Sequence, residues 1–343
     1  VGYIDNSGKY SRFNEMINAA REGEPTVVET SAIVPTFLPK NLDILTNSRE
    51  NGLVLFGKRY INNTDTPNSD IVYGYKYIQS GQERPQTAWF KWKFNTPIKY
   101  HFIIDDDYYF LDKNNFLQTI SLKQKTADPS IDQDGINYLI NLDNWTTVTN
   151  GVYSEVTNKT TFTNQSDWID QVITPNGSLV VIDIDTNVAR IGRYAQCTVQ
   201  NSDDFTLPGD WSTGTFYIGY LYDYQVEFPK FRVSKTDGKS SKSDINSSMI
   251  IHRVKLAFGK SGLYSTTLKR LGKPDYTNTH ESTLADGYDA NDAPYLPDQQ
   301  QTIPIYEKSD NVNLILKSSH PGPASLNATI WEGDYSNKYY KIV

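Results

Sequence analysis

Short runs of apolar, β-branched and aromatic residues, separated by turn-forming residues, make up most of this chain. Between Thr26 and Leu122 the runs read TVVETSAIVP, GLVLFGKRY, DIVYGYKYIQ, TAWFKWKF, IKYHFIIDDDYYFLD and FLQTISLK. The segments NSRENG, NNTDTPNSD and NTP between them hold the residues that turns require. Short antiparallel strands at regular spacing are typical of propeller blades or of a β-sandwich, so the pattern predicts units of this kind.

One segment near the start has the period of a helix instead. The run YSRFNEMINAAREGE places four apolar side chains on one helical face: Phe13, Met16, Ile17 and Ala20. Ser11 stands where a helix cap is expected, and Gly23 stands where a helix would stop. The sequence therefore predicts one short N-terminal helix that packs against the strands.

The composition changes over residues 126–213, which are rich in Asp, Asn and Thr and contain the strand-like runs SLVVIDID and VARIGRYAQCTV. Longer runs follow, namely TFYIGYLYDYQVEFPKFRV, SMIIHRVKLAFG, GLYSTTLKR, NVNLILKSS and NATIWEGDY. We therefore predict an all-β, mostly antiparallel fold in three parts. Residues 1–125 would form the helix and propeller-like blades, residues 126–213 an inserted β module, and residues 214–343 a sandwich-like or barrel-like β domain.

Composition supports the all-β prediction and limits the partners. Aromatic residues make up 13% of the chain, and 24 of the residues are tyrosine, which suits half-buried strand faces and wet interfaces. The net charge is −7 with an isoelectric point near 5.2. A net negative charge disfavours binding to a phosphate backbone, which depends on positive side chains and counterion release. Nucleic acid is therefore expected to slide past this chain without being bound.

Three further features concern stability and location. Cys197 is the single cysteine and cannot form a disulfide within the chain, so packing or subunit contacts must supply the stability. No run of 18 apolar residues occurs, so no transmembrane helix is predicted. Val1 is followed by neither the positively charged segment nor the apolar segment of a secretory signal. This predicts a processed chain or the ordered part of a longer one.

Paired carboxylates are the first candidates for chemistry, because such pairs cleave glycosidic bonds. The candidates are Asp105, Asp106, Asp107 and Asp112 in IDDDYYFLD, and Asp183 and Asp185 in VVIDIDTN. In a strand, Asp183 and Asp185 would share one face at roughly 6–7 Å. We favour a structural interpretation of the first group, in which residues 105–107 form the turn of a hairpin.

Metal ligands are the next candidates. The run DPSIDQDG resembles a calcium loop through Asp128, Asp132, Asp134 and Gly135, but Leu139 stands where an EF-hand needs its last glutamate. A solvated loop is the alternative that we favour. The four histidines, none in zinc-binding spacing, are His101, His252, His280 and His320. We expect His101 and His252 to be structural residues within strands.

Nucleophilic and nucleotide-binding motifs are missing from the sequence. There is no G-x-S-x-G elbow, no phosphate-binding loop and no dinucleotide-binding glycine pattern, and Cys197 lies in a strand pattern without a nearby histidine. FGKSG, from Phe258 to Gly262, lacks phosphate-loop spacing and is predicted to be a turn between two strands. The N-x-[ST] sequons that begin at Asn144, Asn158 and Asn327 are expected by chance in an Asn- and Thr-rich chain.

The run WFKWKF, from Trp89 to Phe94, interleaves basic and aromatic residues and could stack on bases. We favour a strand with Trp89 and the lysines on one face, and Phe90, Trp92 and Phe94 on the other. The sequence therefore predicts no catalytic residue, no cofactor-binding residue and no metal ligand, and hence no enzyme.

Several runs, taken in order, resemble the tail nozzle family (tail tubular protein B) of short-tailed bacteriophages. They are VVETSAIVPTFLPKNLDILTNSRENGLVLFG, then ERPQTAWFKWKFNTPIKYHFIIDDDYYFLDKNNFLQTISL with Gln86, Trp89, Trp92 and Phe94, then FYIGYLYDYQVEFPKFRV, IIHRVKLAFGKSGLYSTTLKR, and ASLNATIWEGDYSNKYYKIV with Trp331, Glu332 and Gly333. The resemblance covers most of the chain except the Asp-, Asn- and Thr-rich part. The family's chains are much longer, so it implies that an N-terminal part is absent here.

The resemblance implies a structural virion protein of the phage tail. It implies a homohexameric ring below the portal and the tail adaptor, with a channel through which genomic DNA passes without specific binding. Tail fibres and the host surface are further expected partners. One alternative is a carbohydrate-binding or glycan-degrading tail fibre or spike, in which Trp145, Trp168 and Trp211 would stack on sugars. A second alternative is a bacterial surface adhesion module.

Overall fold

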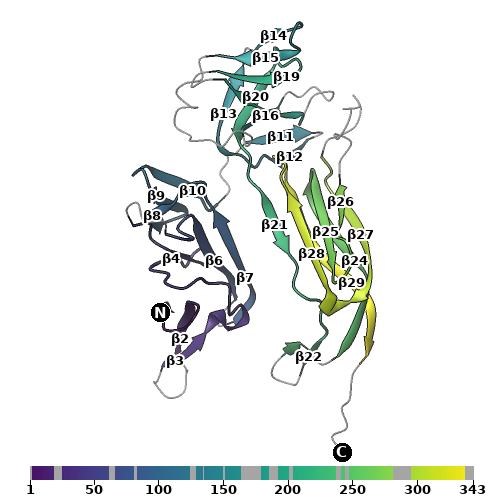
Figure 1. Ribbon diagram of the computed structural model, residues 1–343. Coiled ribbons are helices and arrows are strands. Elements are labelled where there is room, and N and C mark those ends of the chain that lie inside the picture. The colour runs from purple at the N-terminus through teal and green to yellow at the C-terminus, as the bar shows by residue number, and fades with distance from the viewer. Residues whose placement is uncertain are drawn as a thin grey trace, which may run out of the picture. The chain divides into compact units, whose positions relative to one another are not determined.

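A computed structural model gives the fold of the chain (Figure 1). It describes residues 2–18, 25–61, 66–80, 83–123, 129–133, 135–149, 151–163, 179–184, 192–200, 204–236, 241–243, 247–280 and 295–336. Most of these residues lie in antiparallel strands and very few in helical turns, which confirms the predicted all-β fold. None of the described helical segments has the length and apolar character needed to cross a membrane.

The chain divides into two compact units, residues 1–126 and residues 127–343. The elements of the first unit are β1 (Gly2–Asp5), β2 (Arg12–Asn18), β3 (Pro25–Glu29), η1 (Thr30–Ile33), β4 (Ile44–Ser48), β5 (Leu53–Gly57), β6 (Ile71–Ser80), β7 (Glu83–Lys93), β8 (Ile98–Ile104), β9 (Asp107–Asp112) and β10 (Leu117–Ser121).

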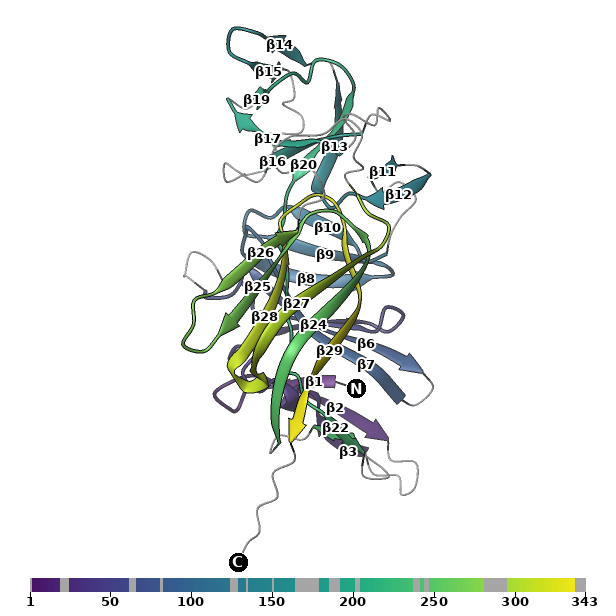
Figure 2. The ribbon, with the colours of Figure 1, turned by 90° about the vertical axis from the view of Figure 1, so that its right-hand side faces the viewer.

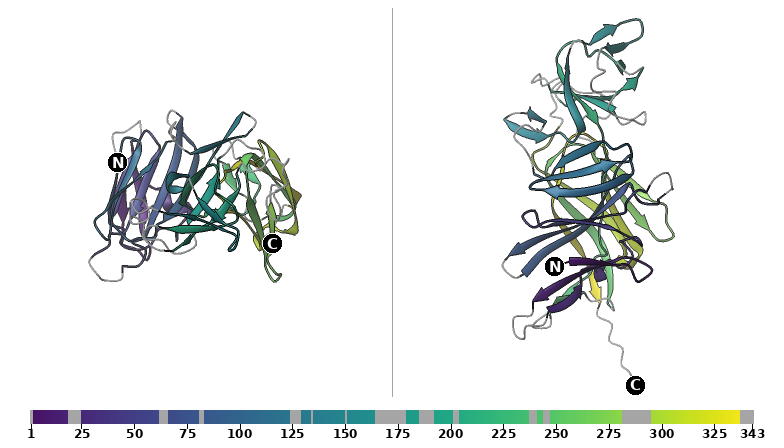
Figure 3. Two further views of the ribbon diagram at one scale, coloured as in Figure 1. Left: turned by 90° about the horizontal axis from the view of Figure 1, so that it is seen from above. Right: turned by 90° about the vertical axis from the view of Figure 1, so that its left-hand side faces the viewer.

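Three antiparallel sheets follow one another in the first unit, with strand orders β1-β2-β3, β4-β5-β6-β7 and β10-β9-β8 (Figure 3, right). The middle sheet is covered on both faces. Val54 and Phe56 of β5 pack with Phe13 of the first sheet, whereas Leu53 and Leu55 pack with the third sheet. This two-sided burial explains why β5 is a continuous apolar run and does not alternate.

The predicted N-terminal helix is wrong. Residues 12–18 form β2, which pairs with β1 on one side and with β3 on the other. Phe13 is buried in the core, whereas Met16 is exposed, as strand geometry dictates for positions three apart. The apolar spacing fits both periods over so short a run, and the sheet partners decide between them. Ala20 and Gly23 lie outside the described residues.

The elements of the second unit are β11 (Ser130–Gln133), β12 (Ile136–Leu139), β13 (Asp143–Thr149), β14 (Val152–Ser154), β15 (Lys159–Phe162), β16 (Leu179–Asp183), β17 (Tyr194–Gln196), β18 (Thr198–Val199), β19 (Phe205–Pro208), β20 (Thr215–Tyr220), β21 (Tyr224–Glu227), β22 (Ser234–Thr236), β23 (Ser241–Ser243), β24 (Ser248–Ser261), β25 (Tyr264–Arg270), β26 (Tyr276–His280), β27 (Gln299–Lys308), η2 (Ser309–Asn311), β28 (Val312–Ser318) and β29 (Ala324–Ser336).

Two pairs of larger sheets and two two-stranded sheets, β11-β12 and β22-β23, make up the described part of the second unit. The sheets β13-β20-β16-β17 and β14-β15-β19-β18 share one core, in which the rings of Phe162 and Phe205 stack with centroids 4.9 Å apart. The sheets β21-β28-β25-β26 and β27-β24-β29 share another, and Figure 2 shows these two layers. In β28, buried and partly exposed positions alternate, as expected for a sheet with one solvated face.

The two-stranded sheet β11-β12 packs with β16 and with Tyr295, which precedes β27. The side-chain amide of Gln133 donates to the Tyr295 carbonyl at 3.2 Å, and its oxygen accepts from the Tyr295 amide at 3.3 Å. The ring of Tyr295 stacks on Tyr138 with centroids 5.1 Å apart. These contacts belong to the single unit 127–343, and its division into an inserted module and a C-terminal domain remains our proposal.

Candidate functional site

The acidic run IDDDYYFLD is used to build two turns. Asp105, with φ of +52°, and Asp106 form the tight turn between β8 and β9, as predicted, and Asp107 is already the first residue of β9. Lys123 Nζ lies 2.7 Å from the Asp106 carboxylate. The Asp112 carboxylate accepts from the backbone amides of Asn114 at 2.8 Å and Phe116 at 2.9 Å, which shapes the turn into β10.

The other carboxylate candidates do not form a catalytic pair among the described residues. Asp183 is buried at the end of β16, where its backbone pairs with Arg193 and Gly192. Asp185 lies outside the described residues, so the predicted 183–185 pairing stays a prediction. The first group and Asp183 also belong to different compact units.

The calcium-like run contains a hairpin. Asp132 lies in β11, and its carboxylate accepts from the Gly135 amide at 2.9 Å, which closes the turn into β12. Asp128 and Asp134 lie outside the described residues. Within the part of the chain that the structure describes, no group of three His, Cys, Asp or Glu side chains could hold a metal ion.

The four histidines lie in separate environments. His101 is buried in β8 beside Tyr108, and burial lowers the pKa of its imidazole to about 4. His320 is also buried, with a pKa lowered to about 3 by burial, and its Nδ1 accepts from the Gly322 amide at 2.9 Å. Both are neutral near pH 7, as core histidines must be when no carboxylate compensates for burial.

The remaining two histidines are more accessible. His280 ends β26 and stacks on Tyr264, and burial lowers the pKa of its imidazole. His252 lies in β24, as expected, with its Nε2 3.1 Å from the Asp334 carboxylate and its ring stacked on Tyr306. None of these contacts pairs a histidine with a nucleophile.

Cys197 and the glycine-rich run are structural. Cys197 is buried between β17 and β18, and burial raises the pKa of its thiol, which disfavours the reactive thiolate. The predicted turn over residues 258–262 is wrong for most of its length. Phe258 to Ser261 continue β24, and the chain leaves the strand only at Gly262.

The aromatic and basic run lies in β7 in the predicted orientation. Trp89 packs on the core between the first and second sheets, whereas Phe90, Trp92 and Phe94 pack on the core between the second and third sheets. All four aromatic rings of the run therefore pack against the cores that join the three sheets.

The tryptophans predicted for sugar stacking are mostly unavailable. Trp211 is buried, and the Arg193 guanidinium lies 3.9 Å from its ring centroid. Trp168 lies outside the described residues. Trp145 keeps 37% of its surface exposed and packs edge-on against Tyr217. Among the described residues, the half-exposed indole of Trp145 is what remains of the predicted sugar-stacking site.

Sequence reasoning missed a bidentate ion pair in the first unit. Arg84 of β7 binds both oxygens of Glu15 of β2, at 2.6 and 2.9 Å, and its guanidinium lies 4.2 Å from the Tyr77 ring centroid. Burial alone would raise the pKa of Glu15, but hydrogen bonds from Arg84 and Thr30 lower it below its usual range. The two partners are 69 positions apart, so no local pattern could reveal them.

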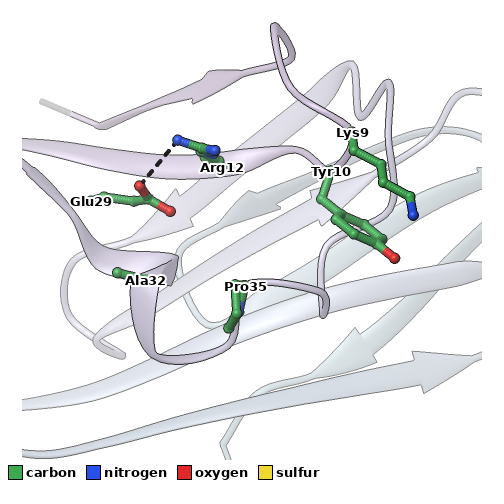
Figure 4. A pocket seen from close by; sticks show the side chains of 6 residues that line it. All are labelled: Lys9, Tyr10, Arg12, Glu29, Ala32 and Pro35. Carbon is green, nitrogen blue, oxygen red and sulfur yellow. Dashed lines mark ion pairs between the residues drawn. The ribbon is translucent and has the colours of Figure 1, made fainter.

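A shallow cavity of about 290 Å³ lies beside β2 in the first unit (Figure 4). It is lined by Lys9, Tyr10, Arg12, Glu29, Ala32 and Pro35. The Arg12 guanidinium lies 3.6 Å from the Glu29 carboxylate, so the acidic group of the lining is already paired. The lining offers a hollow for contact but no nucleophile with an adjacent base.

The negative charge is concentrated in one part of the chain. Residues 127–213 contain 12 of the 40 acidic residues but only 3 of the 33 basic ones, a net charge of −9. The rest of the chain is close to neutral. Any anionic polymer that meets residues 127–213 is therefore repelled.

Comparison with known proteins gives one match over the whole chain. A family model described as bacteriophage nozzle protein matches residues 1–342. No curated protein sequence matches the chain.

Solved structures of the exo-β-1,3-galactanase from Phanerochaete chrysosporium have little similarity to the chain. The complex with galactose is 10% identical, with a TM-score of 0.18, and the alignment covers 96% of this chain and 65% of the enzyme. A variant with β-1,3-galactotriose is 11% identical, with the same TM-score and coverage. The chain thus spans about 65% of the length of these structures, and a likeness this weak carries no argument.

Proposed function

Because this chain belongs to the bacteriophage nozzle protein family, whose model matches residues 1–342, we propose that its copies form a ring-shaped channel through which the phage genome leaves the virion. The family makes the chain a structural component of the phage tail. This proposal includes a homohexameric ring, contacts of that ring with the tail adaptor, and the passage of DNA through it.

The use of polar side chains in the described residues supports a structural role without catalysis. The acidic run builds turns, two histidines are buried and neutral, and the thiol is buried. Catalysis needs a nucleophile, base or acid that converges on a substrate, and these groups instead serve separate turns and cores. We propose accordingly that the protein has no enzymatic activity and needs no cofactor.

The distribution of charge supports a channel that releases its cargo. A wall that bound DNA would need lysine and arginine to neutralise phosphates, and each such contact slows the passage of the polymer. Residues 127–213 carry a net charge of −9, and the remainder of the chain has no compensating excess of positive charge. Acidic and neutral surfaces repel or ignore DNA, which suits a conduit.

Imaging the purified assembly along its axis tests this proposal. We expect a closed ring with an axial channel wide enough for duplex DNA, and a native mass of six copies. A trimer with a closed axis would favour the tail spike alternative. A monomer that hydrolyses a glycan, and that loses this activity when one aspartate is neutralised, would contradict the proposed function.

A further inference from the structure

We propose that the loop between β28 and β29, residues 319–323, is an acid-sensitive latch between the two pairs of larger sheets in the second unit. At neutral pH this latch loop joins the first sheet pair, residues 143–220, to the second sheet pair, residues 224–336, and protonation of His320 releases it. The latch lies within a single chain, so it depends on neither a ring nor a channel.

A short stretch of chain connects the two sheet pairs. Residues 221–223 lead from β20, in the first pair, to β21, in the second. So short a connection can act as a hinge unless other contacts hold it. The latch loop supplies such a contact, because the Asp223 carboxylate accepts from the Ser319 hydroxyl at 2.5 Å and lies 2.9 Å from Lys317 Nζ.

The centre of the latch loop contacts the first sheet pair. The backbone amide of Asn141, two residues before β13, donates to the Pro321 carbonyl at 2.6 Å, and its side-chain amide donates to the Gly322 carbonyl at 3.4 Å. The ring of His320 packs edge to face on the ring of Tyr194 in β17, with centroids 4.7 Å apart. These contacts connect residues far apart in the sequence, so they depend on the two sheet pairs being held together.

The ends of the latch loop are fixed to the second sheet pair. Ser318, the last residue of β28, donates its hydroxyl to the Leu263 carbonyl at 2.8 Å. At the other end, the Gly262 amide donates to the Pro323 carbonyl at 2.8 Å. Both partners lie in the turn between β24 and β25. With its ends held in this way, the loop has its freedom to move at the centre, over residues 320–322.

His320 holds the centre of the loop in its folded shape. Its Nδ1 accepts from the Gly322 amide at 2.9 Å, which places the proton of the neutral imidazole on Nε2. A side chain at position 322 would overlap the Tyr295 ring and His320 Nδ1, so the backbone of the loop packs directly on both rings. A protonated imidazole carries a hydrogen on each nitrogen. It cannot accept from Gly322, and its charge would be buried among aromatic rings.

The surroundings of His320 offer no compensation for a positive charge among the described residues. The titratable groups that face its ring are the phenols of Tyr194 and Tyr295, which stay neutral in acid, while Asn141 presents amide groups to the loop and Gly262 presents backbone. Burial is the one cause that lowers the pKa of His320, to about 3.

Opening of the loop returns the imidazole to its ordinary pKa near 6.5. Between pH 6.5 and the folded pKa the open loop therefore binds a proton that the closed loop does not bind, so acid favours opening. The equilibrium constant for opening should rise close to tenfold for each pH unit between about pH 6 and pH 4.

Hydrogen exchange of the full chain measures this opening. Protection of the amides of Asn141 and Gly322, corrected for the intrinsic exchange rate at each pH, should fall together by about 50-fold between pH 6.5 and pH 4.5. At each pH, protection of these two amides should be lower than that of β20 and should not change in dilute urea, because a local opening exposes little surface. Protection of β20, which requires unfolding of a core, should fall as urea is added.

Two variants separate the acid response from the mechanical contact. His320→Asn keeps a hydrogen-bond acceptor for the Gly322 amide but cannot be protonated in this range, so protection at the latch should be the same at pH 6.5 and pH 4.5. Ser319→Ala removes the bond to Asp223. Protection should then be lower at both pH values, but the fall between them should stay about 50-fold.

Two further variants are the matched controls. Tyr194→Phe keeps the ring that packs on His320 and removes a hydroxyl that does not titrate in this range. Asp143→Asn removes the carboxyl two positions beyond Asn141. Asp143 pairs with Tyr220 of β20 inside the first sheet pair, and this pairing does not involve the loop. Both controls should keep the pH dependence of the wild type.

Three outcomes would overturn the latch proposal. Protection at Asn141 and Gly322 that does not change with pH in the wild type would show that His320 does not control the loop. An unchanged pH dependence in His320→Asn would assign the acid response to another group. Amides of the loop that share the protection and the urea dependence of β20 would show that the loop opens only when the unit unfolds. The first and third outcomes need no variant, so they decide the proposal even if His320→Asn does not fold.

Discussion

His101 illustrates how single residues of this chain are used for structure. Its imidazole is buried in β8 against Tyr108, and neither ring nitrogen has a hydrogen-bond partner among the described residues. A charged imidazole there would lose its hydration without compensation, which is why burial lowers its pKa to about 4. In the unfolded chain the same group titrates near 6.5.

This difference predicts acid sensitivity of the fold. Between about pH 6.5 and pH 4 the unfolded state binds a proton at His101 and the folded state does not, so stability falls as the pH falls, by about 3 kcal/mol across the window. His101→Leu should reduce the pH dependence of the free energy of unfolding by that amount. Urea titrations at pH 7, 5.5 and 4.5 measure it.

Tyr108→Phe is the control for the His101 variant, because it removes a neighbouring buried hydroxyl without removing a group that titrates in this range. Its stability should change by a similar amount at all three pH values. An unchanged pH dependence in His101→Leu would contradict the assignment of acid sensitivity to this residue. His320 should keep part of the dependence in either variant, because its pKa is lowered as well.

At the scale of elements, the turn between β4 and β5 depends on a glycine. Gly52 has φ of +55°, and a Cβ there would overlap the carbonyl oxygen of Tyr77 on β6. The Tyr77 amide donates to the Gly52 carbonyl at 2.8 Å, so the turn is tied to the neighbouring strand and cannot move away. The conformation of the turn therefore depends on the position of β6, and the packing of β6 at this point depends on a glycine in the turn.

We expect Gly52→Ala to destabilise the first unit by about 2–4 kcal/mol, the sum of the left-handed backbone penalty and the overlap with the β6 backbone. Thermal denaturation followed by tryptophan fluorescence measures the loss. Gly272→Ala is the matched control, because Gly272 has φ of +75° but no atom within 4 Å of its ideal Cβ position. That control should cost about 1 kcal/mol, and equal costs for the two variants would contradict the role given to the Tyr77 backbone.

For the whole molecule, the separation of charge predicts how it meets DNA. Residues 127–213 hold a net charge of −9, and the remaining residues are nearly balanced. The assembled protein should therefore bind duplex DNA more weakly than the range of about 10⁻⁴ to 10⁻⁶ M that is usual for non-specific binding at physiological salt. Filter binding at 50 mM and 200 mM salt measures both the affinity and its salt dependence.

A steep loss of DNA affinity with rising salt would contradict this expectation, because it would reveal several phosphate contacts to lysine or arginine. Such a result would require a local cluster of lysine and arginine side chains, either within one chain or formed where copies meet.

The fold class and many strands follow from local pattern alone. Turn residues between apolar runs predicted the β-rich fold, and the alternation in WFKWKF predicted which side of β7 each aromatic side chain occupies. The same reasoning predicted the turn at Asp105 and Asp106. These features depend on residues close together in the chain, where side-chain period and turn chemistry are decisive.

Contacts between residues far apart in the sequence determined the features that local pattern did not predict. Residues 12–18 fit a helix by period, but β1 and β3 on either side make them a strand, and only packing shows that Trp211 is buried while Trp145 is exposed. The pairing of Glu15 with Arg84 also arises from a contact between distant residues. Local pattern limits the backbone to a strand or a turn, but burial is a property of the whole packed unit, so which faces stay open is settled only when the sheets come together.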